Sequence, residues 1–170
     1  MVSDDQRSSQ LTDSQQEQIE QRRVDQDRTL VAMHELEQAL GTAAPTRETR
    51  WRETVLDALL VFGDATREEA QNAERPDSLL SDVAFNQPRL RSRVRGLRTQ
   101  YRQLQQSIDA MRDEIHEAGD ATVDFADIRQ RLAWLLTALR HQRARESDLI
   151  YEAYYEAFQT DLGREAQANV

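Results

Sequence analysis

The sequence predicts an all-α fold, an up-down-up-down four-helix bundle, on three observations. Large apolar residues in the segment 88–118 recur at alternating steps of four and three residues from Leu90 to Ile115, the pattern of a helix packed lengthwise against other helices. Only 5 glycines and 3 prolines occur in 170 residues, which favours long helices over a β fold with many turns. Short links between the first and second and between the third and fourth helical segments favour a closed antiparallel bundle.

The N-terminal part of the chain divides into a tail and a long helix. Residues 1–13 are polar and show no periodicity, so we expect a disordered tail before a bundle that spans 14–163. The first helix is predicted over 14–40, because Ser14 and Glu17 have the spacing of a capping box. Its first half has few apolar residues, so we expect it to overhang the bundle or to pair with another chain.

The second helix is predicted over 48–73, followed by the longest connection of the chain. Gly63 lies inside this helix, and we interpret it as a tolerated weak point rather than as a close helix crossing. The stretch LLSDVAF at 79–85 is too apolar for a free loop. We expect it to form a short helical turn over one end of the bundle, with a lid over a site as the alternative.

The third and fourth helices are predicted over 88–118 and 124–158, with residues 164–170 as a frayed tail. Pro88 suits the first position of a helix. The first half of the third helix carries six arginines, which we interpret as a solvated face paired with acidic neighbours rather than an anion-binding strip. In the fourth helix the polar interval RHQRARESD, residues 140–148, interrupts an otherwise apolar face.

Composition narrows the classes of function. A net charge of −9 and a pI near 4.9 argue against general nucleic-acid binding, which needs a basic surface. The sequence has no apolar run long enough for a membrane span, and its first ten residues lack the apolar core of a signal peptide. We therefore expect a soluble cytoplasmic protein that binds neither nucleic acid nor membrane. The absence of cysteine excludes disulfides and thiolate metal sites.

The stretch HQRARESDLIYEAYYEAFQTDLG at 141–163 resembles the last helix of haemerythrin-like (HHE cation-binding) domains. The order of four helices and the proline that opens the third helix after a long link are similar as well. The resemblance covers roughly 25–163 and implies a di-iron centre held by histidines and carboxylates. The family's ligand positions fall at Asp27 in the first helix, Asp64 and Glu68 in the second, Tyr101 and Gln105 in the third, and His141 and Glu146 in the fourth.

Most of the chemistry of that centre is replaced in this chain. Glu68, His141 and Glu146 match the family pattern, whereas four of its five histidines are gone, and imidazole suits iron in such a site. Tyr101 is expected to fill space that the metals would occupy. We therefore expect no cofactor, with iron as the candidate ion if a residual site persists. That residual metal site would use His141, Glu146, Glu68, Asp64 and Asp27.

Without a metal, inward-facing carboxylates must pair with cationic side chains, since an unpaired buried carboxylate strongly destabilises the folded state. The nearest candidates by register are Arg143, Arg98 and Arg102. We predict that arginine–carboxylate pairs have replaced the metal ion.

These observations favour a protein that is not an enzyme. The sequence has no nucleophile elbow and no phosphate-cradling glycine loop. A di-iron carboxylate enzyme would need Glu-x-x-His on two helices, and the nearest match is Asp113 with His116. We expect an interaction or regulatory protein that binds an unidentified protein partner or itself, through the bundle surface and the start of the first helix. The alternative is an iron-binding domain that binds or senses oxygen or iron.

Overall fold

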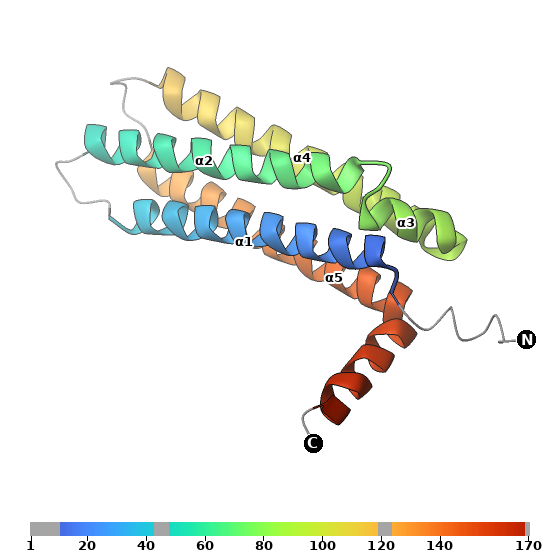
Figure 1. Ribbon diagram of the computed structural model, residues 1–170. Helices are drawn as coiled ribbons and strands as arrows, with labels where there is room; N and C mark the ends of the chain where they lie inside the picture. Colours follow the sequence, from blue (N-terminus) through green and yellow to red (C-terminus); the bar gives the residue numbers. More distant parts are fainter. Residues whose placement is uncertain (1–10, 43–47, 119–123, 169–170) are drawn as a thin grey trace, which may run out of the picture.

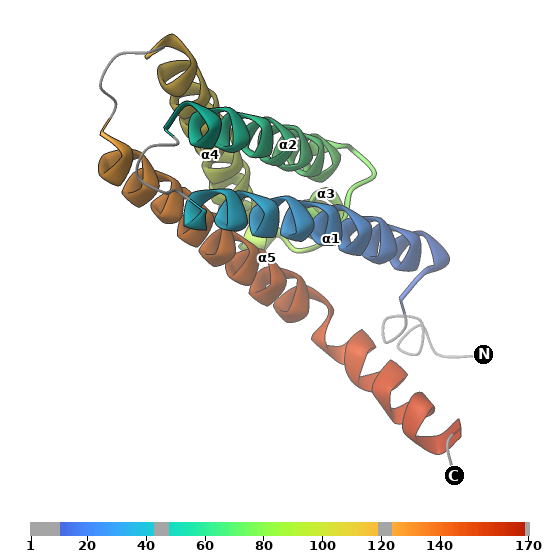
Figure 2. The same cartoon turned by 90° about the vertical axis from the view of Figure 1, so that its left-hand side faces the viewer.

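The computed structural model describes residues 11–42, 48–118 and 124–168, with side chains up to Tyr155 in the last range. Its four long helices are α1 (Asp13–Gly41), α2 (Glu48–Glu74), α4 (Arg91–Glu117) and α5 (Phe125–Ala168). Consecutive long helices run in alternating directions (Figures 1 and 2). No strand occurs among the described residues, so the predicted all-α bundle is confirmed over that part of the chain.

Two short elements fill the long connection between α2 and α4. The helix α3 (Leu79–Asn86) begins after Ser78, whose hydroxyl oxygen accepts a hydrogen bond from the backbone nitrogen of Ser81 at 3.2 Å. A 3-10 turn, η2 (Pro88–Leu90), then leads into α4. The predicted helical turn is therefore confirmed. It packs against one end of the bundle (Figure 1).

The capping box that starts α1 lies two residues before the predicted one. Thr12 Oγ1 accepts from the backbone nitrogen of Gln15 at 3.2 Å, and Gln15 Oε1 accepts from the backbone nitrogen of Thr12 at 2.9 Å. Thr12 and Gln15 have the same spacing as Ser14 and Glu17, so spacing alone does not distinguish the two pairs. The predicted tail at 1–13 falls mostly outside the described residues, but Asp13 already belongs to α1.

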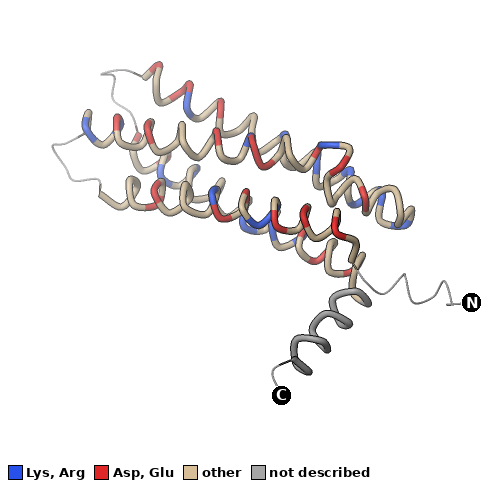
Figure 3. Tube along the Cα trace, in the orientation of Figure 1, with Lys and Arg blue, Asp and Glu red and all other residues tan. Residues whose placement is uncertain are grey.

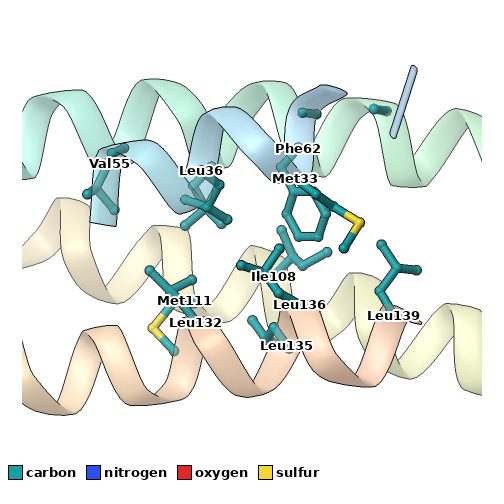
Figure 4. Packing of buried hydrophobic residues seen from close by; sticks show 14 of the residues in the cluster. Met33, Leu36, Val55, Phe62, Ile108, Met111, Leu132, Leu135, Leu136 and Leu139 are labelled. Atoms are coloured by element: carbon teal, nitrogen blue, oxygen red, sulfur yellow. The ribbon is translucent and has the colours of Figure 1, made fainter. Parts of the chain in front are cut away.

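The larger part of the core lies between all four long helices (Figure 4). The seam predicted for the third helix is confirmed, because its large apolar side chains are buried except for Leu104, which is partly buried. Fully buried or nearly buried residues from each helix meet there: Met33 and Leu36 of α1, Val55 and Phe62 of α2, Ile108 and Met111 of α4, and Leu132, Leu135, Leu136 and Leu139 of α5.

A smaller apolar cluster joins α3 to the bundle. It contains Leu79, Leu80 and Val83 with Leu90, Val94, Leu97, Leu149 and Ile150. Ile19, from the first half of α1, packs against this cluster, and Gln15 Nε2 donates to Asp82 Oδ2 of α3 at 3.0 Å. The expectation that the first half of α1 overhangs the bundle is therefore wrong.

Gly63 marks a close approach of α2 and α4. A Cβ atom at this position would lie 3.2 Å from Cγ2 of Ile108. That distance is tighter than most Cβ contacts, so the structure supports the close-crossing alternative over the interpretation as a tolerated weak point.

Helix α5 continues past the predicted end at residue 158 and through Gly163 to Ala168, and residues 169–170 of the predicted frayed tail lie outside the described residues. The backbone departs from helical geometry at Tyr154, with φ −118° and ψ 19°. No described helix combines the length and the apolar character that a membrane span requires.

Candidate functional site

The residues predicted to form a residual metal site do not come together. The side chains of Asp27, Asp64, Glu68 and His141 are exposed, and only Glu146 is buried. Asp64 pairs with Arg67 at 2.7 Å, and Glu68 pairs with Arg28 on the bundle surface. Within the described ranges, no three or more His, Cys, Asp or Glu side chains are grouped so that they could hold a metal ion.

A different set of polar side chains meets inside the bundle, which we name the polar centre. It consists of Arg22, Asp25 and Thr29 of α1, Glu69 and Asn72 of α2, Tyr101 of α4, and Arg143 and Glu146 of α5. Each of the four long helices contributes at least one member. Within the polar interval predicted at 140–148, Gln142, Arg143 and Glu146 face the interior, and the other residues of the interval are exposed.

The difference from the predicted set is one of helical register. The buried carboxylate of α2 is Glu69, whose side chain is 5% exposed, whereas that of Glu68 is 54% exposed. The buried carboxylate of α1 is Asp25 rather than Asp27, and on α5 the buried neighbour of His141 is Gln142. Since successive residues of an α-helix are about 100° apart, a shift of one position exchanges an inward side chain for an outward one.

Glu69 accepts hydrogen bonds from three elements. Arg143 Nη2 donates to Glu69 Oε2 at 2.8 Å, and Thr29 Oγ1 donates to the same oxygen at 2.6 Å. The hydroxyl of Tyr101 lies 3.1 Å from Glu69 Oε1. The pair of Arg143 and Glu69 is almost wholly buried, so its hydrogen bonds are little weakened by water.

Glu146 is held in a similar way from α1 and α4. Arg22 Nε donates to Glu146 Oε1 at 2.9 Å, while the Tyr101 hydroxyl contacts Glu146 Oε2. Arg22 Nη2 also donates to Ser147 Oγ at 3.0 Å. Arg22 was not among the arginines predicted from the sequence. It lies seven residues before the buried Thr29 and on the same helix face, but Thr29 is itself polar, so apolar periodicity gave no sign of either residue.

Asp25 is the third carboxylate of the polar centre. Asn72 Nδ2 donates to Asp25 Oδ2 at 2.8 Å, and Gln21 Nε2 donates to Asp25 Oδ1 at 3.1 Å. Arg28 lies 3.8 Å from the same Oδ1. The three buried carboxylates are therefore met by two guanidinium groups inside the bundle and a third at its edge.

Tyr101 connects the two glutamates. The side chain is buried, as expected, and its hydroxyl reaches both Glu69 and Glu146. Burial, together with the charges of Glu146 and Glu69, raises the pKa of Tyr101 well above its ordinary value. The phenol is therefore a hydrogen-bond donor to carboxylates at neutral pH. Gln105, the other family position on α4, instead donates to Thr66 of α2.

A small cavity of about 30 Å³ lies beside the polar centre. Arg22, Asp25, Glu69, Asn72 and Glu146 line part of it. This volume suits one or two water molecules. It is far below the 300–1,000 Å³ that is typical of pockets for small organic ligands.

The other arginines considered from the sequence have different roles. Arg98 Nη2 donates to Ala73 O at 3.1 Å and to Ser81 Oγ at 2.7 Å, so it ties α4 to the end of α2 and to α3. Arg102 pairs with Glu74 on the surface. Of the three arginines named from the sequence, Arg143 alone pairs with a carboxylate of the polar centre.

Arg89 of η2 and Arg93 and Arg102 of α4 pair with acidic residues, as the sequence suggested for this part of the chain. Arg89 and Arg93 both bind Glu152 of α5, and the two guanidinium groups lower the pKa of Glu152. Basic and acidic residues are interspersed along all four long helices (Figure 3). These pairs support a solvated, ion-paired face rather than an anion-binding strip.

In comparisons with known proteins, no family model matches the chain, and no curated protein or solved structure matches it either. The haemerythrin-like resemblance therefore stays a prediction from the sequence. The donors present fit a di-iron centre poorly, because the polar centre contains no imidazole and its two glutamates already bind guanidinium groups.

Proposed function

We propose that this chain is a haemerythrin-like bundle that has lost its di-iron site and serves as a non-catalytic interaction or regulatory protein. One observation carries the proposal. Glu69 and Glu146 are buried carboxylates, and each is bound by an arginine and by the hydroxyl of Tyr101.

A guanidinium group is a hydrogen-bond donor that keeps its positive charge at any ordinary pH. Arg143 and Arg22 therefore neutralise the two glutamates permanently and engage oxygen atoms that a metal ion would need. An incoming cation would have to separate both pairs, and it would leave two charged guanidinium groups in or near the core. This arrangement supports a bundle that is stable without metal.

The outer surface supports an interaction role. Several large apolar side chains remain exposed, among them Phe85 of α3 at 80% and Trp134 of α5 at 64%. Exposed aromatic side chains beside hollows on the surface are typical of protein contact sites. The cavity beside the polar centre, in contrast, has no room for an organic substrate.

Two measurements test the proposal. Protein supplied with ferrous iron and then desalted should show no oxygen-dependent visible band. Such a band, with iron retained in proportion to protein, would contradict the proposal and favour the binding or sensing of iron or oxygen. Crosslinking in the cells that make the protein should join one face of the bundle to a defined protein partner or to a second copy. An absence of specific crosslinks would contradict the interaction role.

A further inference from the structure

Trp134 stands at the middle of a groove between α4 and α5. Its side chain is 64% exposed, although its neighbour Leu135 belongs to the core. A hollow of about 490 Å³ lies on the side of Trp134 toward the start of α5, and Asp127 and Arg131 line it. A second hollow, of about 320 Å³, lies on the other side. Both hollows include Trp134 and Ser107 in their lining, so they lie next to each other, and we call the two together the groove.

The floor of this groove has room for a large side chain. Small residues line it on both helices, with Ser107 and Ala110 from α4 and Thr137 and Ala138 from α5. A buried tryptophan contributes one of the largest apolar contact areas of any side chain. The groove therefore exposes the Trp134 side chain. One helical turn away, the space over Ala138 could accommodate a tryptophan side chain from a partner.

The two ends of the groove carry opposite surplus charge. At one end, Arg131 is shared by two carboxylates, with Glu114 at 2.7 Å and Asp127 at 3.2 Å. One negative charge is therefore left over. At the other end the lining includes His141 and Arg145 but no carboxylate, on a chain whose net charge is −9. Among the described residues, none forms an ion pair with Arg145.

We propose that the groove centred on Trp134 is a self-association surface, on which a second copy of this chain docks with its α5 antiparallel. The inference rests on the proposed interaction function and names its partner. In this arrangement a two-fold axis passes between Trp134 and Ala138, so that Trp134 of each copy packs over Ala138 of the other. Residues 127 and 145 are equally far from that axis in sequence, so Asp127 of each copy meets Arg145 of the other.

The helical geometry of α5 is compatible with this proposed dimer. Asp127, Trp134, Ala138 and Arg145 fall within about 40° of one another around an ideal helix, so they share one face of α5. The 18 residues from Asp127 to Arg145 span about 27 Å at 1.5 Å per residue. A two-fold axis produces each contact twice, which gives two tryptophan contacts and two ion pairs from one face. Phe85, another exposed aromatic residue, lies on α3 and outside this groove.

Sedimentation equilibrium of the full chain tests the inference. We expect a dimer whose population rises with protein concentration and falls as salt is raised, because the ion pairs are exposed to screening. Trp134→Ser should raise the dissociation constant of the dimer by about 30-fold or more, as expected for a central aromatic residue of an interface. Phe85→Ser is the matched control and should leave the dimer unchanged. Circular dichroism checks that both variants keep their helices.

A mixing experiment tests the antiparallel pairing. Asp127→Arg and Arg145→Glu should each weaken self-association, because like charges then meet at both contacts. An equal mixture of the two variants restores opposite charges at both contacts, so the heterodimer should form about as well as the wild-type dimer. Failure of the mixture to associate would overturn the proposed geometry.

Other outcomes are equally decisive. A chain that stays monomeric, or a dimer that Trp134→Ser leaves intact, would overturn this inference. A monomeric chain without iron would leave the proposed function standing with a different partner. A chain that retains stoichiometric iron and gives an oxygen-dependent spectrum would instead overturn the proposed function, whatever its state of association.

Discussion

The hydroxyl oxygen of Tyr101 lies 3.1 Å from Oε1 of Glu69, and the same hydroxyl contacts Glu146. A hydroxyl has one hydrogen to donate, so Tyr101 serves two carboxylates with a single donor. The guanidinium groups of Arg143 and Arg22 supply the charge that these carboxylates need. Tyr101 thus links α2, α4 and α5 at the point where the apolar core gives way to polar side chains.

Replacement of Tyr101 by phenylalanine should destabilise the protein. The ring would still fill its space, but Glu69 and Glu146 would lose a buried donor, which typically costs about 1–3 kcal/mol. Urea denaturation monitored by circular dichroism measures the change in the free energy of unfolding. Tyr155→Phe, at a half-exposed position, is the control and should change it by less than about 0.5 kcal/mol. Equal stability of the two variants would contradict the role given to Tyr101.

Stability should fall in alkaline solution, in part through Tyr101. Its pKa is raised in the folded protein by burial and by the charges of Glu146 and Glu69. A raised folded-state pKa contributes stability that is complete below the unfolded value, about 10 for tyrosine, and is lost as pH rises toward the folded value. This group should therefore lower the free energy of unfolding by up to about 1.4 kcal/mol per pH unit above pH 10.

Comparison with Tyr101→Phe isolates that contribution, because Tyr154 also has a raised pKa and remains in both proteins. Urea denaturation at a series of pH values should give a shallower alkaline decline for the variant. Parallel declines in the two proteins would show that Tyr101 is not responsible.

Arg143→Met should be among the most destabilising substitutions in the chain. It removes the charge partner of buried Glu69, and breaking a buried ion pair from one side costs about 3–5 kcal/mol. The matched control is Arg102→Met, which breaks an exposed pair with Glu74 and should cost about 1 kcal/mol or less.

The double variant Arg143→Met/Glu69→Gln distinguishes pairing from packing. If the loss comes from an uncompensated carboxylate, neutralising Glu69 should recover a large part of it. Strictly additive losses in chemical denaturation would mean that Arg143 stabilises the bundle through its aliphatic contacts instead.

Two glycines inside helices should respond oppositely to alanine. Gly96 has no atom within 4 Å of an added Cβ, so Gly96→Ala should stabilise α4 by about 0.5–1 kcal/mol. At Gly63 the same gain is opposed by contact with Ile108 at 3.2 Å, and overpacking of a core costs about 1–3 kcal/mol. In thermal unfolding, the Tm of Gly96→Ala should therefore lie above that of the wild type, and the Tm of Gly63→Ala should lie below it. The reverse order would contradict the close crossing of α2 and α4.

Helices with a strongly apolar face were predictable from the sequence. The regular spacing of apolar residues from Leu90 to Ile115 predicted the buried face of α4 correctly, and the apolar stretch at 79–85 predicted a helical turn where α3 lies. In both cases the burial of large apolar side chains dominates folding, and their spacing in the sequence shows which residues are buried.

The first half of α1 was misjudged because its inward face is polar. Arg22, Asp25 and Thr29 occupy positions where the pattern would normally show aliphatic residues. Each is stabilised inside the bundle by a partner from another helix, and such partners are distant in sequence. Apolar periodicity therefore could not distinguish a segment that packs along one polar face from a segment that overhangs the bundle.

The type of interaction in the polar centre was predicted from the sequence, but the residue that α2 contributes to it was not. The expectation that arginine would pair with buried carboxylates is met by Arg143 and Glu69, although the sequence pointed to Glu68. Glu68 and Glu69 are adjacent carboxylates, so composition cannot say which faces inward. The apolar face of α2 does distinguish them, because Glu69 lies seven residues after the buried Phe62 and therefore on the same face of the helix.

Elemental analysis of protein purified without chelator tests most directly whether side chains alone hold the polar centre together. We expect no iron or other transition metal in proportion to protein, and an unfolding curve that a chelator leaves unchanged. Stoichiometric metal, together with a loss of stability when chelator is added, would contradict it.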